Sequence, residues 1–191
     1  MSRPREFDID RALQLSMEVF WTKGFKSTSY EDLTSITGVK KQSLYGVFND
    51  KRSLFLKALK LYREQSIGRL QEIENQETSP IEKLNAMRDL LLNGELESKG
   101  CLMVNSVLEF GTTDEQISSE AEMMQTGFKQ IIERIIRSGQ EQQLISNRFT
   151  SKELANYLNN SIVGLKVMEK SGSKREEIEA VLRTSFAMML S

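Results

Sequence analysis

The chain has 191 residues, enough for a substantial hydrophobic core, and one cysteine, Cys101, which excludes an internal disulfide. It has no histidine, the commonest metal ligand and acid–base catalyst, so we do not expect an enzyme. The net charge of −1 is unevenly placed: residues 1–63 hold twelve Lys and Arg against seven Asp and Glu, whereas residues 64–191 hold fourteen against twenty. A basic segment joined to an acidic body is typical of a phosphate-facing module.

No apolar run approaches the roughly 20 residues that span a bilayer, and the first ten residues, MSRPREFDID, lack the apolar core of a signal peptide. We therefore expect a cytoplasmic protein without a membrane partner. The chain also shows no nucleotide-binding glycine loop and no clustered spacing of metal-ligating residues. We accordingly expect no cofactor and no metal.

Helical periodicity recurs along the first 72 residues, without a convincing alternating strand pattern. Four helices are predicted there from capping residues and glycine stops. They are one begun by Asp8 and ended by Gly24, one begun by Ser27, Thr28 or Ser29 and ended by Gly38, one over 41–48, and a longer one opened by Asn49 or Asp50.

Beyond about residue 72 the chain breaks and begins a new set of helices. Capping boxes, in which a Ser or Thr is followed three residues later by Glu, precede three apolar-periodic runs. These boxes are Ser79 with Glu82, Thr150 with Glu153, and Ser173 with Glu176. Between them lie a short apolar helix, GCLMVNSVLEFG, and a long helix from Asp114 to about Gln140. The predicted fold class is all-α, with about nine helices.

Two short helices joined by a tight, glycine-containing turn in a basic segment are typical of a helix-turn-helix. On the helix over 41–48, Leu44 and Phe48 lie four apart and are expected to face inward. The opposite face carries Lys41, Gln42, Tyr45 and Gly46. Glycine costs about 1 kcal/mol relative to alanine inside a helix. It would be tolerated either because DNA comes close to the helix there or because the helix end is frayed.

Residues 24–55, GFKSTSYEDLTSITGVKKQSLYGVFNDKRSLF, resemble the DNA-binding signature of the tetracycline-repressor (TetR) family of transcription regulators. The matching features are Gly24-Phe25, Thr28-Ser29, Gly38-Val39, Leu44-Tyr45, Phe48 and Lys51, in register without a gap. The resemblance is strong over about 8–62 and only architectural beyond. It implies a ligand-responsive DNA-binding regulator, a repressor released from a double-stranded operator by a small-molecule effector.

The resemblance also implies which residues contact DNA. Thr28, Tyr45 and Lys51 would contact backbone phosphate, while Lys40, Lys41, Gln42 and Gly46 fall where relatives approach base edges. Ser29, next to Thr28 in the signature, joins them in the predicted DNA-binding set. Two positions depart from the family pattern, because Lys40 replaces a common capping serine and Thr34 replaces a frequent alanine.

The resemblance divides the chain into a helix-turn-helix domain over 1–50 and a helical ligand-binding and dimerisation domain over 51–191, connected by the fourth helix, 50–72. Apolar stripes on the last two helices predict a homodimer surface, although burial within one subunit is an alternative for each residue. The stripe residues are Leu154, Leu158, Ile162, Leu165, Ile178, Leu182, Phe186 and Met189.

Adaptable apolar and aromatic side chains in the body are candidates for a ligand pocket, with core packing as the alternative. The predicted lining residues are Met103, Asn105, Glu109, Phe110, Met124, Phe128 and Tyr157. Asn105 and Glu109 stand four apart on an otherwise apolar helix, where either a polar ligand or another helix could satisfy them.

Two further functions stay open from the residues alone. Cys101, which follows Gly100 near a helix start, could sense oxidants or electrophiles, or it could be a buried packing residue. In a different class, the chain could be a helical adaptor whose basic face binds no DNA.

Overall fold

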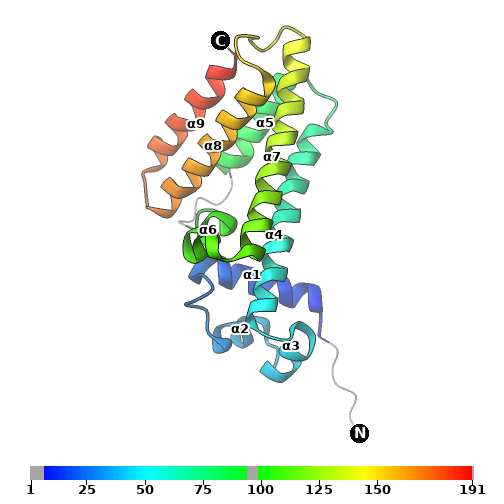
Figure 1. Ribbon diagram of the computed structural model, residues 1–191, viewed down its shortest axis with the longest axis vertical. Helices are drawn as coiled ribbons and strands as arrows, with labels where there is room; N and C mark the ends of the chain where they lie inside the picture. Colours follow the sequence, from blue (N-terminus) through cyan, green and yellow to red (C-terminus); the bar gives the residue numbers. More distant parts are fainter. Residues whose placement is uncertain (1–6, 94–98, 191) are drawn as a thin grey trace.

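The computed structural model describes residues 7–93 and 99–190, and regular secondary structure in these ranges is exclusively helical (Figure 1). This confirms the all-α class. The helices are α1 (Ile9–Lys23), α2 (Tyr30–Thr37), α3 (Lys41–Phe48), α4 (Lys51–Glu74), α5 (Pro80–Asn93), α6 (Leu102–Phe110), α7 (Glu115–Glu141), α8 (Ser151–Lys170) and α9 (Arg175–Leu190), with a short 3₁₀ turn, η1 (Gly111–Thr113), before α7. The predicted domains include residues 1–6, 94–98 and 191, which lie outside the described part.

Local capping chemistry accounts for the N-terminal helix boundaries. The Asp8 carboxylate accepts a hydrogen bond from the Arg11 N–H at the start of α1, and Asp50 accepts one from Ser53 at the start of α4. Among the three cap candidates for α2 it is Ser29 that begins the helix, in a capping box with Asp32. No side chain caps α3, which agrees with the departure at Lys40.

The molecule is elongated, with α1, α2 and α3 at one end and the body helices at the other (Figure 1). The long helices α4 and α7 run along this axis and pack against each other. The first half of α4 buries Phe55 and Leu59 against the N-terminal helices, while its second half buries Leu70 and Ile73 in the body core. α4 therefore contributes to both hydrophobic cores, and it can transmit displacement between them.

The last helix begins later than its predicted capping box. α9 starts at Arg175, and the backbone oxygen of Lys174 accepts hydrogen bonds from the N–H groups of Glu177 and Ile178. The predicted box of Ser173 with Glu176 is therefore wrong in position. The boxes at Ser79 and Thr150 are present as predicted, with Glu82 and Glu153 accepting from the backbone N–H of the cap residue.

Candidate DNA-binding surface and ligand cavity

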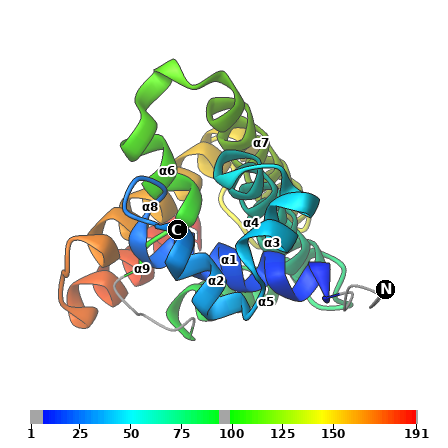
Figure 2. The same ribbon diagram turned by 90° about the horizontal axis from the view of Figure 1, so that it is seen from below.

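The turn between α2 and α3 is built around Gly38. This residue adopts a left-handed conformation, φ +68°, and its N–H donates to the Thr34 backbone oxygen at 3.0 Å. Leu33 and Leu44, both fully buried, hold the two helices against α1 and α4. Figure 2 looks at this end of the molecule, and Figure 1 shows α2 and α3 at the end away from α8 and α9. The sequence thus folds locally into a helix-turn-helix with one open face.

The outward face of α3 is accessible. Lys40, Lys41, Gln42 and Gly46 are exposed, and a Cβ placed on Gly46 would meet no atom within 4 Å. Among the described residues, none forms an ion pair with Lys40 or Lys41. These side chains are therefore free to meet another molecule, and the open space over Gly46 is what a close approach by DNA requires.

Two tyrosines and a lysine form a cluster beside this face. The Tyr30 and Tyr45 rings meet edge to face at 4.9 Å, and the Lys41 ammonium lies 4.2 Å from the centre of the Tyr30 ring. The Tyr45 hydroxyl oxygen is buried, and no described group lies within hydrogen-bonding geometry of it. Burial first, and the nearby Tyr30 phenol second, raise the pKa of Tyr45 to about 12. The group stays protonated at neutral pH, and therefore keeps a hydrogen-bond donor to offer.

Two predicted phosphate contacts have a different role in this conformation. The Thr28 side chain is buried, only 1% of the residue is exposed, and its hydroxyl donates to the Gly24 oxygen at 2.6 Å. The Lys51 ammonium donates to the backbone oxygens of Phe25 and Thr28 at 2.8 and 2.7 Å. Both side chains stabilise the loop before α2 rather than project toward solvent, because that loop has backbone oxygens that no helix satisfies. In the free chain both side chains are thus engaged within the protein, and their role as phosphate contacts stays a prediction.

Ser29 is exposed, but its hydroxyl is engaged in the α2 capping box with Asp32. The Asp32 carboxylate also pairs with Lys23 at 2.5 Å. This bond to Lys23, followed by the bonds from Ser29, lowers the pKa of Asp32 to about 2. The cap is thus ionised at neutral pH, and it anchors α2 to the end of α1.

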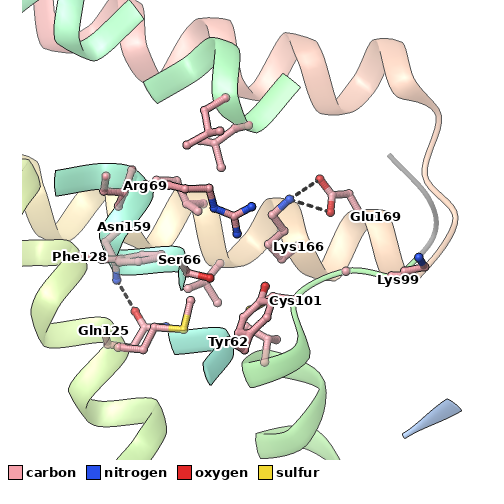
Figure 3. Close-up of a pocket in the computed structure, with 18 of the residues that line it drawn as sticks. Tyr62, Ser66, Arg69, Lys99, Cys101, Gln125, Phe128, Asn159, Lys166 and Glu169 are labelled. Carbon is pink, nitrogen blue, oxygen red and sulfur yellow. Dashed lines mark hydrogen bonds and ion pairs between the residues drawn. The ribbon is translucent and has the colours of Figure 1, made fainter. Parts of the chain in front are cut away.

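A cavity of about 330 Å³ lies in the body, with walls from α4, α5, α6, α7 and α8 and with Trp21 of α1 at one side (Figure 3). Met124 and Phe128 of α7 line it as predicted from the sequence. Their neighbours in the wall include Tyr62 and Ser66 of α4 and Asn159 of α8. This volume lies at the small end of the range that is typical of ligand sites.

The other five predicted lining residues do not line this cavity. The Asn105 amide donates to the Lys99 oxygen at 2.7 Å, and the Glu109 carboxylate accepts from the backbone N–H groups of Phe25 and Lys26 at 2.9 and 2.6 Å. Met103 is buried in the core shared with the N-terminal helices, and Phe110 packs against Phe25 and Phe55 there. Tyr157 is 43% exposed on the outside of α8. Backbone groups of the segments before α6 and after α1, rather than a ligand, satisfy Asn105 and Glu109.

The polar groups that do line the cavity were not identified in the sequence. They include Arg69 on α4, Gln125 on α7, and Asn159, Lys166 and Glu169 on α8. Asn159 and Glu169 are each only 7% exposed. The sequence offered one signal for them, namely polar or charged residues within the otherwise buried stripe of α8. The neighbouring residues did not show which helix would face these side chains.

Cys101 lies in the cavity wall directly before α6, and it is 5% exposed. It belongs to the same buried cluster as Leu102 and Met103. Burial, and then the adjacent Cys101 thiol, raise the pKa of Tyr62 well above its usual range, so the neighbouring phenol is neutral. No feature of these contacts favours oxidant sensing over packing.

The eight residues predicted for the dimer surface are all buried within the single chain. Leu158, for example, is fully buried, and the least buried of the eight, Leu154, is 7% exposed. This corrects the prediction: the stripes form the subunit core, because α8 packs between α7 and α9. The exposed apolar side chains on α8 and α9 are instead Tyr157, Val167, Val181 and Met188.

Within the described ranges, no helix combines the length and the apolar character needed to cross a membrane. The same residues contain no group of three or more Cys, Asp or Glu side chains placed to hold a metal ion.

Two family models match the sequence. Residues 12–58 match the model described as bacterial regulatory proteins, tetR family, and residues 80–185 match the tetracyclin repressor-like C-terminal domain. The HTH-type transcriptional regulator YezE of Bacillus subtilis is 27% identical over 196 residues, covering 99% of this chain and 100% of YezE. The HTH-type transcriptional repressor ComR of Escherichia coli is 24% identical over 191 residues, covering 97% of this chain and 90% of ComR.

Among solved structures, a cysteine variant of the TetR-family regulator CifR in complex with 26-base-pair operator DNA matches with a TM-score of 0.83. It is 25% identical, and the match covers 98% of this chain and 100% of CifR. The likeness therefore extends over both the helix-turn-helix end and the body.

Proposed function

The chain belongs to the TetR family of bacterial regulatory proteins, and on this premise we propose that it is a repressor that binds operator DNA as a homodimer and is released by a small-molecule effector. α3 enters the major groove of the operator. The effector occupies the cavity between α4 and α8.

The observation that carries this proposal is the open face of α3. Lys40, Lys41 and Gln42 are exposed there, and lysine and glutamine can bond to guanine and adenine edges. Gly46 leaves room for the DNA to come close to the helix backbone. A phosphate oxygen would accept a hydrogen bond from the buried Tyr45 hydroxyl, which no group in the described part of the chain satisfies. Tyr45 is thus a better candidate for a phosphate contact than Thr28 or Lys51.

Contacts across the middle of the molecule connect the cavity to the helix-turn-helix. The Trp21 indole, which lines the cavity, donates to the Gly100 oxygen at 3.1 Å directly before α6. At the other end of α6, Glu109 holds the N–H groups of the loop between α1 and α2. An effector that displaces α6 therefore moves the C-terminal end of α1 and the loop that follows it, and with them the orientation of α3. A coupling of about 1–3 kcal/mol between the two sites is typical of such systems.

One α3 helix contacts only a few base pairs. A second α3, supplied by another copy of the chain about 34–36 Å away, therefore multiplies selectivity for the operator. The exposed face of α8 and α9 supplies the surface for this pairing. Tyr157 and Met188 contact each other there, and Val181 lies about two turns before Met188 on α9. Gly164 leaves an open position on α8. An apolar face that is rimmed by polar residues is what a two-fold interface needs.

The test is a genomic footprint with purified protein, followed by titration of the identified operator at several salt concentrations. We expect the logarithm of the affinity to fall linearly with the logarithm of the salt concentration, because phosphate binding releases counterions. Lys41→Gln should weaken binding, whereas Lys60→Gln, which removes an exposed charge from α4, should change it little. A protein that protects no genomic site at low salt would instead support the adaptor function.

A further inference from the structure

Five charged side chains line the cavity, and four of them are arranged as pairs of opposite charge. The Lys166 ammonium bonds to both carboxylate oxygens of Glu169 at 2.8 and 2.9 Å. Lys99 lies 3.8 Å from Glu18. Because Glu169 is buried and already holds its cation, the cavity has no open carboxylate on α8 for a positively charged ligand.

Arg69 is the fifth charged side chain. Among the described residues, none forms a hydrogen bond or an ion pair with its guanidinium, and the described charged side chains of the lining sum to an excess of one positive charge. Figure 3 shows the guanidinium projecting from α4 toward the Lys166 ammonium across the opening. Arg69 is exposed, so it stands at the mouth rather than in the depth of the cavity. A planar guanidinium in this place is suited to grip a carboxylate through two parallel hydrogen bonds.

Much of the cavity interior is apolar, and its buried polar side chains include Ser66 and Asn159. Met87, Met124 and Ile162 are buried in its wall, with Phe128 beside them. Asn159 donates from its amide nitrogen to Gln125 at 2.6 Å, while its amide oxygen is buried and has no hydrogen-bond partner among the described residues. A buried acceptor of this kind is costly unless a donor meets it. A ligand with a hydroxyl or N–H on its apolar part would supply that donor.

We propose that the effector is a small amphipathic monoanion: a carboxylate held at the mouth by Arg69, on an apolar body that carries a hydrogen-bond donor toward Asn159. This inference rests on the proposed function in taking the cavity as the effector site. It adds the chemical class of the effector, which neither the helix-turn-helix nor the family membership specifies.

The test uses matched panels of carboxylates, amides and amines of about six to twelve carbon atoms, a size suited to a small ligand site. A representative set is 4-phenylbutanoate, 4-phenylbutanamide and 4-phenylbutylamine, with 4-(4-hydroxyphenyl)butanoate as the donor-bearing acid. Calorimetric titration of the full chain should show the best carboxylate binding at least about tenfold more tightly than its amide or amine. The hydroxylated acids should bind more tightly than the unsubstituted acids.

Arg69→Gln should bring the carboxylate to within about twofold of its amide, since only the charge-assisted bonds are lost. Lys60→Gln removes one positive charge from the same helix outside the cavity, and should leave the preference unchanged. Equal binding of the three classes, absence of binding by every carboxylate, or a preference that survives Arg69→Gln would overturn the proposal.

Operator titration separates this inference from the proposed function. If a neutral or cationic compound releases the operator and Arg69→Gln has no effect, the ligand class is wrong while the repressor function stands. If the chain binds carboxylates through Arg69 but binds no operator, the repressor function is wrong while the ligand class stands.

Discussion

At the scale of single residues, the outward face of α3 combines exposed side chains with the Tyr45 hydroxyl, which has no hydrogen-bond partner among the described residues. Lys40, Lys41 and Gln42 form no hydrogen bond or ion pair with the described residues, although the Lys41 ammonium lies over the Tyr30 ring. Thr28 and Lys51, in contrast, stabilise the loop that positions α2. The residues predicted to contact DNA thus fall into two groups: exposed side chains that can contact DNA, and side chains that stabilise the helix-turn-helix.

Tyr45→Phe tests the unsatisfied hydroxyl. Operator affinity should fall about tenfold, because a hydrogen bond to a charged phosphate oxygen is worth about 1.5–3 kcal/mol. The melting temperature should stay the same or rise slightly, since the hydroxyl has no hydrogen-bond partner among residues 7–93 and 99–190. Fluorescence anisotropy with labelled operator and thermal denaturation measure the two effects. Unchanged affinity would show that Tyr45 does not reach the DNA.

Gly46→Ala tests the space above α3. The variant should be more stable by up to about 1 kcal/mol, because alanine favours the helix and its methyl group meets no atom. Its operator affinity should nevertheless fall, because the methyl group occupies the space that the DNA needs. A rise in stability with unchanged affinity would favour the alternative that Gly46 merely lies near a frayed helix end.

At the scale of elements, α6 is the connection between the cavity and the helix-turn-helix. Its first residues lie against the cavity, and Glu109 near its end holds the loop before α2 through two backbone N–H groups. The Lys26 ammonium donates back to the Glu109 backbone oxygen at 3.0 Å. Arg52 of α4 is joined to Asp114 before α7 at 2.8 Å, which strengthens the same region.

Glu109→Gln should loosen this connection. We expect the amide hydrogens of Phe25 and Lys26 to exchange about tenfold faster or more, because bonds to a charged acceptor of about 1.5–3 kcal/mol are weakened. Leu108→Gln is the matched control, as its side chain is 70% exposed on the same helix. Hydrogen exchange followed by NMR gives the rates residue by residue. Equal protection in both variants would contradict the role of Glu109.

At the scale of the whole molecule, the inner and outer faces of the last two helices differ in what they contact. The inner faces of α8 and α9 complete the subunit core, whereas their outer faces expose apolar side chains on the flank of the molecule (Figure 1). Two-fold pairing of this flank would place two copies of α3 on one side of the dimer.

Val181→Glu should convert the dimer to a monomer, because a carboxylate would be desolvated at the centre of the proposed interface. Light scattering after gel filtration should then report the mass of one chain in place of two. Operator affinity should fall by at least about a hundredfold, since linked binding raises effective concentration. Leu144→Glu places the same charge on an exposed apolar residue before α8, and should leave the dimer intact.

The amino-acid sequence by itself determined the helices of this protein and the exposed face of α3. Asp8, Ser29 and Asp50 cap their helices through neighbours three residues away, and the helix-turn-helix depends on spacings within one short segment. Such signals are local, so they can be recognised without knowledge of the remainder of the chain.

Only the tertiary structure showed the cavity and which apolar side chains of α8 and α9 stay exposed. Glu109 resembles a ligand-binding group until Phe25, 84 residues earlier, is found to donate to it. Arg69 and Asn159 come from helices that are far apart in sequence, and the stripe through Leu158 could face either its own core or a second chain. The physical reason is that burial depends on which helix faces meet, and periodicity within one helix cannot specify its partner.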